Sequence, residues 1–487
     1  MLLKLMLVTA LVLAPLAPAQ AQDAGAVIAT ASKAMGADTL KTLTYSGSGF
    51  DFAFGQAFSP ADPWPKFQVK SYTRSLDFDR PASRADRVRA QFENPPRGGG
   101  QQPLAGDQNQ SQVIIVDGST PWLQQLEIWM TPHGFLKAAA TRNPTLRAQT
   151  IRGKRYSVIS FNVPGAAPVA GYINDQNLVE RVWTRIDSPM LGDMDLIAEY
   201  SDYRDHNGVK FPAKIVVQQG GAAILDLAVS EVQPNAAVTI QPQGRAGGAP
   251  AAAPAAAPVA GGGTVPTEQI ADGVFLIRGA GAISMAIEFR DHVAVIEGPG
   301  NEARGETVIA ETKRLIPNKP IRYLINTHHH FDHSSGMRPF AAEGARIVTH
   351  EVNADYFKRT LAAPRTLSPD RQQQAKKAVV VEGVGDKKVL TDGNQTIELY
   401  HIRENRHNAG LLMIYLPKQK FLVQADMFNA PAQPGGTLPM PLSVYTQNFL
   451  TNLDRLKLDV ARVIPIHYPA DGRVISYADM MRAVGRN

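Results

Sequence analysis

One short segment of the chain brings together residue types that bind metal ions. Residues 326–336 read NTHHHFDHSSG and directly follow the strand-like run IRYLI. Because alternate side chains of an extended chain point the same way, His328, His330 and Asp332 can converge, while His333 turns toward a neighbouring position. Imidazole and carboxylate groups without thiolate suit zinc, and the same set can hold iron or manganese. The pattern H-x-H-x-D-H therefore predicts one loop that serves two metal ions.

His329, inside this segment, has a different expected role. Its side chain should face away from those of its two neighbours, so we expect it to pack, or to contact a metal-binding side chain rather than the metal. An alternative interpretation of the whole cluster is a solvated polar loop, or a tract that binds metal adventitiously. With 11 histidines in 487 residues, a chance match to the full pattern is rare, which favours a built site.

Three further residues stand at the ends of strand-like runs later in the chain, where loops can bring them to one edge. His407 precedes the run LLMIYLP, Asp426 ends FLVQAD and His467 ends RVIPIH. His401 also ends a strand-like run and is the rival of His407 as a ligand. His350 ends another such run, and its expected role is packing or lining a pocket. The candidate site thus extends from one loop to four segments.

The order and setting of these four segments resemble the metallo-β-lactamase superfamily, over the whole of residues 264–487. The resemblance implies two metal ions, each held by its own side chains, with one aspartate between them. The first metal would have His328, His330 and His407, the second Asp332, His333 and His467, and Asp426 would bridge the two. His401 lacks the Asn-Ala-Gly that follows His407, so it is expected to contact a ligand instead. Two zinc ions are the implied cofactors, with iron or manganese as alternatives.

Such a site predicts hydrolysis of a small-molecule substrate. Two metal ions can share a hydroxide, because metal binding lowers the pKa of water to about 7. Asp332 is the predicted catalytic residue: held on the second metal, it would orient the hydroxide and pass a proton to the leaving group. We therefore expect an enzyme that uses a metal-bound hydroxide to cleave an ester, lactone, thioester or related bond.

Departures from the best-known relatives narrow this expectation. Zinc β-lactamases generally have Cys or Ser where this chain has Asp426, whereas glyoxalase II-like thioesterases, lactonases and phosphodiesterases have a bridging Asp. A β-lactamase is therefore a less favoured alternative. Diiron oxidoreductases usually carry Glu in place of His330, but a mononuclear iron, sulfur-oxidising dioxygenase and a non-catalytic ligand-binding protein stay open. The usual Asp-x-Gly is replaced by Glu-Gly-Pro at 297–299, so we expect a supporting carboxylate to be displaced.

The elements that position the site alternate between strands and helices, which fits a layered α/β arrangement. The resemblance specifies an αββα sandwich over 264–487. Strands are expected at 274–277, 283–289, 292–296, 321–325, 345–348, 395–402, 411–416, 420–424 and 462–466, and helices at 302–315 and 449–458.

The preceding part, 22–242, has a different pattern. After a candidate helix at 24–35, β-branched or alternating runs predict a mainly antiparallel β domain. These runs are 67–78, 111–116, 156–163, 178–186, 194–203 and 209–218. The stretch 200–217 resembles the closing strands of half-barrel domains of the periplasmic lipoprotein-carrier type, and no lipid-binding residue is implied. Residues 95–110, rich in Pro, Gly and Gln, are expected to form a mobile loop.

Composition sets the remaining limits. Residues 243–263 are rich in Ala, Pro and Gly and predict a linker, so the flanking domains should keep some independence. The chain has no cysteine, which excludes disulfides and thiolate ligands. The net charge of +6 is spread along the sequence, and no nucleic-acid partner is expected. The sequence contains no sign of its oligomeric state.

The first 21 residues have the features of a cleaved signal peptide: one lysine, a short apolar run and the small-residue pattern Ala-Gln-Ala at 19–21. The apolar run is shorter than the roughly 20 residues that span a bilayer, and no other stretch is long and apolar enough. We therefore expect a periplasmic or secreted protein without a transmembrane segment in its mature form.

Overall fold

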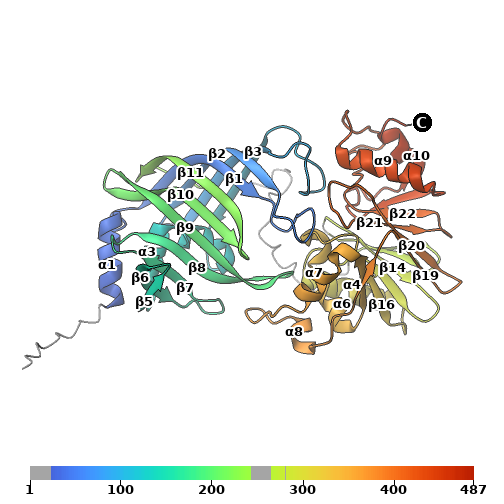
Figure 1. The fold of residues 1–487 in the computed structure, drawn as a ribbon, viewed down its shortest axis with the longest axis horizontal. Coiled ribbons are helices and arrows are strands. Elements are labelled where there is room, and N and C mark those ends of the chain that lie inside the picture. Colours follow the sequence, from blue (N-terminus) through green and yellow to red (C-terminus); the bar gives the residue numbers. More distant parts are fainter. Residues whose placement is uncertain (1–22, 243–264, 280, 487) are drawn as a thin grey trace, which may run out of the picture.

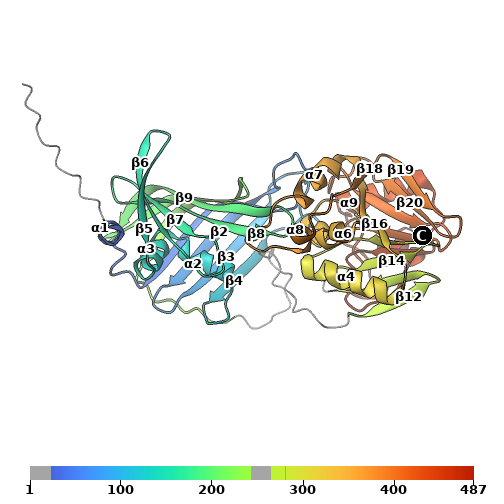
Figure 2. The same ribbon diagram turned by 90° about the horizontal axis from the view of Figure 1, so that it is seen from below.

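The computed structural model describes residues 23–242, 265–279 and 281–486. They form two bodies that lie side by side, an N-terminal β domain and a C-terminal α/β region (Figures 1 and 2). The predicted signal peptide and the predicted linker lie outside the described residues. In the described residues, no helix is both long and apolar enough to cross a bilayer.

The β domain is one 11-stranded sheet in which every neighbouring pair of strands is antiparallel. Its order is β4-β3-β2-β1-β11-β10-β9-β8-β7-β6-β5. Strands adjacent in sequence pair except β4 and β5, which are the two edges, and β11 returns to β1. The strands are β1 (Thr42–Phe52), β2 (Lys66–Asp77), β3 (Ala82–Gln91), β4 (Gln108–Ile115), β5 (Thr145–Ile151), β6 (Lys154–Phe161), β7 (Val169–Ile173), β8 (Val179–Ser188), β9 (Gly192–His206), β10 (Val209–Gln219) and β11 (Ala222–Pro234). This confirms the mainly antiparallel β domain.

Three helices pack against this sheet: α1 (Ala24–Met35), α2 (Trp122–Trp129) and α3 (Pro132–Ala140). Helix α1 has the predicted bounds because both ends are capped. The side chain of Asp23 accepts a hydrogen bond from Gly25 N, and Gly36 takes the left-handed conformation (φ 70°) that ends the helix. The apolar faces of the three helices and of the sheet form one core, which includes Met35, Phe135 and Phe211.

The C-terminal region contains two sheets. A seven-stranded sheet is antiparallel from β12 to β15 and parallel from β15 to β18, and a six-stranded sheet runs from β19 to β24. The first comprises β12 (Thr267–Ala271), β13 (Val274–Ile277), β14 (Ser284–Glu288), β15 (Val293–Ile296), β16 (Ile321–Ile325), β17 (Arg346–His350) and β18 (Val381–Val384). The second comprises β19 (Lys387–Thr391), β20 (Thr396–His401), β21 (Leu412–Leu416), β22 (Phe421–Gln424), β23 (Arg462–Pro465) and β24 (Ile475–Ser476).

Helices cover the outer faces of the two sheets, and three apolar cores separate the four layers. The core between the sheets includes Ile287 and Ile414. A second core lies under the helices of the first sheet and a third under those of the second. The helices are α4 (Glu302–Leu315), α5 (Phe331–Ser334), α6 (Arg338–Glu343), α7 (Glu351–Leu361), α8 (Arg371–Ala375), α9 (Val444–Leu456) and α10 (Tyr477–Ala483). The predicted αββα sandwich is therefore confirmed.

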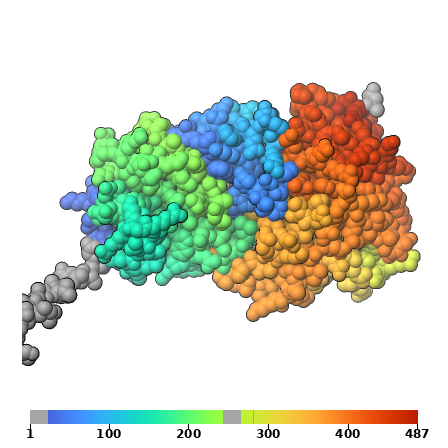
Figure 3. All heavy atoms as spheres, in the orientation of Figure 1, coloured from blue at the N-terminus to red at the C-terminus, as the bar shows by residue number. Residues whose placement is uncertain are grey.

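The β domain and the C-terminal region are in direct contact, so the expected independence of the two is wrong. Met190, at the tip of the β8–β9 hairpin, is fully buried in the core of the C-terminal region. Arg365, which is only 4% exposed, forms ion pairs with Asp187 of β8 and with Asp370. Figure 3 shows the surfaces of the two bodies meeting without a gap on this face. A flexible linker does not exclude an interface made by loops that are distant in sequence.

Candidate metal centre

The predicted site residues lie just beyond the carboxyl ends of strands from both sheets. His328 and His330 follow β16, Asp426 follows β22 and His467 follows β23. His407 lies in the loop between β20 and β21. Because β22 and β23 are parallel, their ends meet at one edge, where β16 of the facing sheet also ends. The layered fold thus brings four distant segments together.

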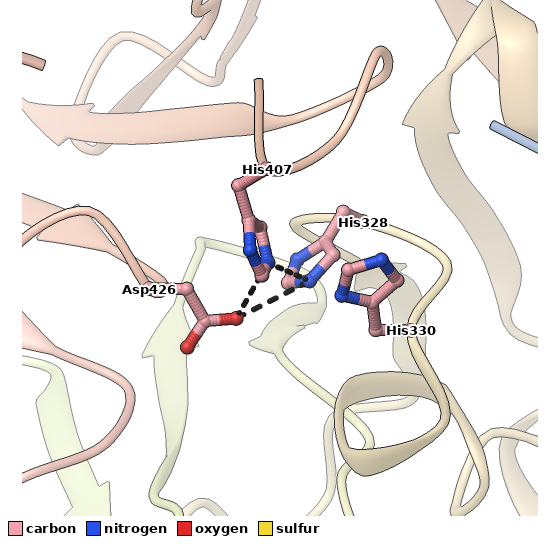
Figure 4. Close-up of side chains that lie close together, drawn as sticks. All are labelled: His328, His330, His407 and Asp426. Carbon is pink, nitrogen blue, oxygen red and sulfur yellow. Dashed lines mark hydrogen bonds and ion pairs between the residues drawn. The ribbon is translucent and has the colours of Figure 1, made fainter. Parts of the chain in front are cut away.

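A first group consists of His328, His330, His407 and Asp426, all buried (Figure 4). Nε2 of His407 lies 3.1 Å from Nε2 of His328 and 3.1 Å from Oδ2 of Asp426, and His328 Nε2 lies 3.3 Å from the same oxygen. Tetrahedral ligands about 2.0–2.1 Å from zinc are about 3.3 Å apart. The spacing therefore fits a four-coordinate metal ion.

His330 completes this group through its other ring nitrogen. Its Nε2 donates a hydrogen bond to the backbone oxygen of Ala57 at 2.8 Å. Its Nδ1 is buried and has no hydrogen-bond partner, and Figure 4 shows the ring turned with a nitrogen toward His328. A buried lone pair without a partner costs free energy unless something binds it. This atom is the strongest sign in the structure that the group fits a metal ion.

A second group consists of Asp332, His333, His467 and the same Asp426. Nε2 of His333 lies 2.9 Å from Oδ2 of Asp426 and 3.3 Å from Oδ2 of Asp332. Nε2 of His467 lies 3.1 Å from His333 Nε2 and 3.1 Å from Oδ1 of Asp426. The side chain of Asp332 is 38% exposed and that of His467 only 11%, so the centre is open on the side of Asp332.

Asp426 belongs to both groups, as a bridging ligand would. Its backbone has a positive φ of 63°, which is uncommon for a residue other than glycine and costs free energy. Burial alone would raise the pKa of its carboxyl, but the charges of His333 and His467 hold that pKa well below its ordinary value. The carboxylate is therefore ionised and offers both oxygens.

The histidines of the two groups differ in their electrostatic environment. Burial lowers the pKa values of His328 and His330 well below the ordinary value, so their lone pairs are free for a metal ion. In the second group burial has the same effect, but the nearby carboxylates outweigh it. They raise the pKa of His333 well above its ordinary value and that of His467 to about 9. The second group thus stabilises positive charge.

Glu297 supports the centre, so the expected displacement of this carboxylate is wrong. Its Oε2 accepts hydrogen bonds from His333 Nδ1 at 2.7 Å and from Thr327 Oγ1 at 2.6 Å, and its Oε1 accepts one from Thr327 N at 2.9 Å. Glu297 has a left-handed backbone conformation (φ 69°), and its side chain is one methylene longer than that of aspartate. The bond to Nδ1 directs Nε2 of His333 toward the centre.

The other strand-end histidines lie outside both groups. His329 is buried, and its Nδ1 accepts a hydrogen bond from Asn408 Nδ2 at 3.0 Å, in the loop that carries His407. His401 Nε2 donates to the backbone oxygen of Ala409 at 3.0 Å, in the same loop. The ring of His350 packs at a tilt against that of His401, with centroids 4.0 Å apart, and Nδ1 of His350 caps helix α7. These contacts match the packing and supporting roles expected for them.

Two glutamines of the β domain, which the sequence did not indicate as site residues, contact predicted ligands. Gln56 Nε2 donates to Oδ1 of Asp332 at 2.8 Å, and Gln102 Nε2 donates to the backbone oxygen of Asp426 at 3.2 Å. Both belong to loops whose composition resembles that of ordinary surface loops. A single sequence contains no signal for contacts across such separations.

Residues 284–467 match the family model described as the metallo-beta-lactamase superfamily. The matched segment begins at β14 and ends at His467, so it contains all seven predicted ligand positions. Together with the two facing sheets and their outer helices, it defines the C-terminal region as a metallo-β-lactamase fold. The family usually binds divalent metal ions, and the two groups of side chains could hold them.

Individual relatives are distant. The chain is 27% identical over 177 residues to 2,4-dinitroanisole O-demethylase subunit alpha of Nocardioides sp. (strain JS1661), over 34% of this chain and 48% of the relative. The chain thus matches only about half the length of that protein. Among solved structures, a metallo-beta-lactamase from Pontibacter korlensis is 16% identical, with a TM-score of 0.34, over 45% of this chain and 97% of that one. DIM-1 metallo-beta-lactamase is 15% identical, with a TM-score of 0.34, over 46% and 96%.

Proposed function

We propose that this chain is a dinuclear metal-dependent hydrolase that cleaves an ester, lactone, thioester or related bond in a small molecule. The observation that carries the proposal is the pair of adjoining ligand groups that share Asp426. Each group offers four ligand atoms within 4.8 Å of one another. Two zinc ions fit these nitrogen and oxygen donors, and iron or manganese would be held by the same side chains.

Two bound metal ions would supply an activated water and polarise the bond to be cleaved. Asp332 is the residue placed to handle protons. It is the most exposed member of the two groups, and its Oδ2 faces His333 and His467. Burial would raise its pKa, but the charge of His333 lowers that pKa well below its ordinary value, so the carboxylate is ionised and can accept a hydrogen bond from a water molecule. It would orient the water and pass a proton to the leaving group.

The bridging position argues for a general metallohydrolase rather than a β-lactamase. Asp426 stands where zinc β-lactamases generally have Cys or Ser. Its Oδ2 lies 3.1 Å from His407 of the first group and 2.9 Å from His333 of the second, and its Oδ1 lies 3.1 Å from His467. The curated relative is named as an O-demethylase subunit, which adds an aryl methyl ether to the bonds worth testing. The two complete ligand groups favour two metal ions over the single iron of a sulfur-oxidising dioxygenase.

The test combines metal analysis with a substrate panel. We expect about two divalent ions per chain, and turnover of at least one ester, lactone, thioester, phosphodiester, β-lactam or aryl ether substrate that stops when a chelator removes the ions. Hydrolysis by the metal-free protein would contradict the proposal. One iron per chain with oxygen consumption would favour the dioxygenase, and binding of a ligand without turnover would favour a non-catalytic protein.

The Asp332→Asn variant tests the proton-handling role. An amide cannot accept the proton, so turnover should fall by about 10²–10⁴-fold while the unfolding temperature stays unchanged. Asp355→Asn is the matched control, because this aspartate is 82% exposed on α7 and pairs only with Lys358. Normal turnover by Asp332→Asn would remove Asp332 from the mechanism.

We also propose that the protein is exported to the periplasm or secreted. The support is the lysine, apolar run and Ala-Gln-Ala pattern of the first 21 residues. Expression of the full chain followed by fractionation should yield a mature protein whose sequence begins at Gln22. A cytoplasmic protein that retains these residues would contradict export.

A further inference from the structure

Two loops of the β domain extend to the metal centre. The β1–β2 loop, residues 53–65, and the β3–β4 loop, residues 92–107, leave the same end of the sheet. In Figure 1 these loops lie between the strands of the β domain and the C-terminal region. Their contacts with predicted metal ligands are direct, so the β domain cannot be treated as a separate unit joined only by a linker.

The β1–β2 loop contacts one ligand of each group. The amide of Gln56 donates to Oδ1 of Asp332 at 2.8 Å, which leaves Oδ2 facing His333 and His467. The backbone oxygen of Ala57 accepts the Nε2 proton of His330 at 2.8 Å, which leaves Nδ1 free for a metal ion. Such contacts fix the orientation of a carboxylate and the tautomer of an imidazole.

The close approach of this loop depends on a glycine. Gly55 has φ +81°, and a Cβ there would lie 2.5 Å from the ring of Phe331. Phe331 is the residue between His330 and Asp332, and its backbone N–H donates to Gly55 O at 3.1 Å. Its ring packs edge-on against Phe54, with centroids 5.3 Å apart. The loop thus holds the metal-binding segment at Phe331, between the predicted ligands His330 and Asp332.

The β3–β4 loop contacts the segments that carry the other ligands. Gly98 N donates to the backbone oxygen of Arg406 at 2.8 Å, next to His407, and Gly98 O accepts from the hydroxyl of Tyr445 at 2.6 Å. Gln102 Nε2 donates to the backbone oxygen of Asp426 at 3.2 Å. Residues 108–110 of the expected mobile loop already belong to β4, and Gly98 and Gln102 in the remainder contact segments of the centre. Three of the four ligand segments are therefore contacted by the β domain.

From these contacts we propose that the β domain completes the metal centre, with Gln56 as a positioning residue for Asp332. The proposal rests on the metal site of the proposed function and extends it to a domain outside the family match, which begins at residue 284. Gln56 holds one oxygen of Asp332 so that the other remains directed at the second group. The metal-binding unit is the two-domain chain rather than the C-terminal region alone.

The test is a substitution that removes the donor and keeps the shape of the side chain. In the full-length protein, Gln56→Met should weaken the affinity for one of the two metal ions by about 10–100-fold, the effect typical of losing a hydrogen bond to a ligand. Competition with a chelator measures both affinities. Visible absorption of the Co²⁺-substituted protein reports the ligand geometry. The absorption should change only for the ion whose affinity the substitution lowers. A purely structural role would leave this spectrum unchanged.

Gln101→Met is the matched control. Gln101 lies in the β3–β4 loop at the same interface, but its hydrogen bond is with Asn429, which is not a predicted ligand. The metal affinities and Co²⁺ spectrum of the Gln101→Met variant should equal those of the unaltered protein. Gly55→Ala is a second variant, since the added Cβ displaces the loop from Phe331 and should weaken metal binding in the same way.

The outcomes separate this inference from the proposed function. If the unaltered protein binds two ions and both Gln56→Met and Gly55→Ala retain its affinities and spectrum, the inference is overturned and the hydrolase proposal stands. If the unaltered protein binds no metal, both are overturned. If only the two variants lose an ion, the inference holds for whichever substrate the enzyme uses.

Discussion

Glu297→Gln is the sharpest test of how the centre is held, because it changes one atom in a fully buried contact. The carboxylate accepts four hydrogen bonds, from the backbone and hydroxyl of Thr327, from Asn326 and from Nδ1 of His333. In glutamine the Oε1 contacts can survive. The amide NH₂ that replaces Oε2 then faces Nδ1 of His333, and two donors cannot share a hydrogen bond.

The raised pKa of His333 means that both ring nitrogens carry protons in the metal-free protein. Metal binding must remove the proton from Nε2, which lies 2.9 Å from Asp426 and 3.3 Å from Asp332. In the variant, the neutral imidazole can instead keep its remaining proton on Nε2 and accept from the new amide through Nδ1, and a protonated Nε2 has no lone pair for a metal ion. Loss of such a supporting partner typically costs 10–100-fold in metal affinity, or about 1.4–2.7 kcal/mol. We expect this loss at the second metal, with a smaller effect at the first.

The assay is competition between the metal-free protein and a chelator of known affinity, with both binding steps resolved. Glu311→Gln is the control, because Glu311 is also nearly buried, at 8% exposed, but pairs with Arg314 on α4, away from the centre. It should leave both affinities unchanged. If Glu297→Gln binds both ions within about twofold of the unaltered protein, the tautomer argument based on these contacts is refuted.

Two further predictions concern the interface and pH. Met190→Ala should lower the free energy of unfolding of the C-terminal region by about 3 kcal/mol, since it empties a fully buried site. Met194→Ala is the control, because Met194 belongs to the core of the β domain. Calorimetry measures both variants, and an unchanged C-terminal transition in Met190→Ala would contradict the packing. Affinity for the second metal should fall as pH drops below about 9. In the metal-free protein the pKa of His467 is raised to about 9, so below that pH the imidazole holds a proton that the metal must displace. Titrations in metal buffers from pH 6 to 9 check this, and a flat profile would contradict it.

Much of the C-terminal region was predictable because its signals are local. The strand at 274–277, the helix at 302–315 and the strand at 321–325 have the predicted bounds, since their apolar periods are clear. Three of the four ligand segments were predictable because each follows a buried strand, and the fourth, with His407, precedes one. The family resemblance supplied the pairing. The structure brings these residues into two groups, and their binding of metal stays a prediction until it is measured.

The β domain was predictable as a class but not in its contacts. Helices α2 and α3 were not identified, and neither were the strands β1, β3, β5, β7 and β11. In β3, for example, seven of the ten residues are half-buried in one continuous run without alternation. The Pro- and Gly-rich stretch at 95–110 was predicted to be a mobile loop; residues 95–107 lack regular structure, whereas 108–110 belong to β4. Composition alone does not show that a loop has a docking partner, so its contacts with the metal centre were not found.

The contacts between the β domain and the metal centre were missed because they join residues far apart in sequence, and Phe331 is an example. The pattern H-x-H-x-D-H specifies the ligands but not the amino acid at the position between His330 and Asp332. In this chain that position holds an aromatic ring that packs against Phe54 and Trp64 of the β domain, with centroids 5.3 and 5.9 Å away. The ring excludes any side chain at Gly55, which sets the distance of the loop that carries Gln56. A residue of the motif without metal chemistry thus joins the β domain to the centre, alongside the contacts of Gln56 with Asp332 and of Ala57 with His330.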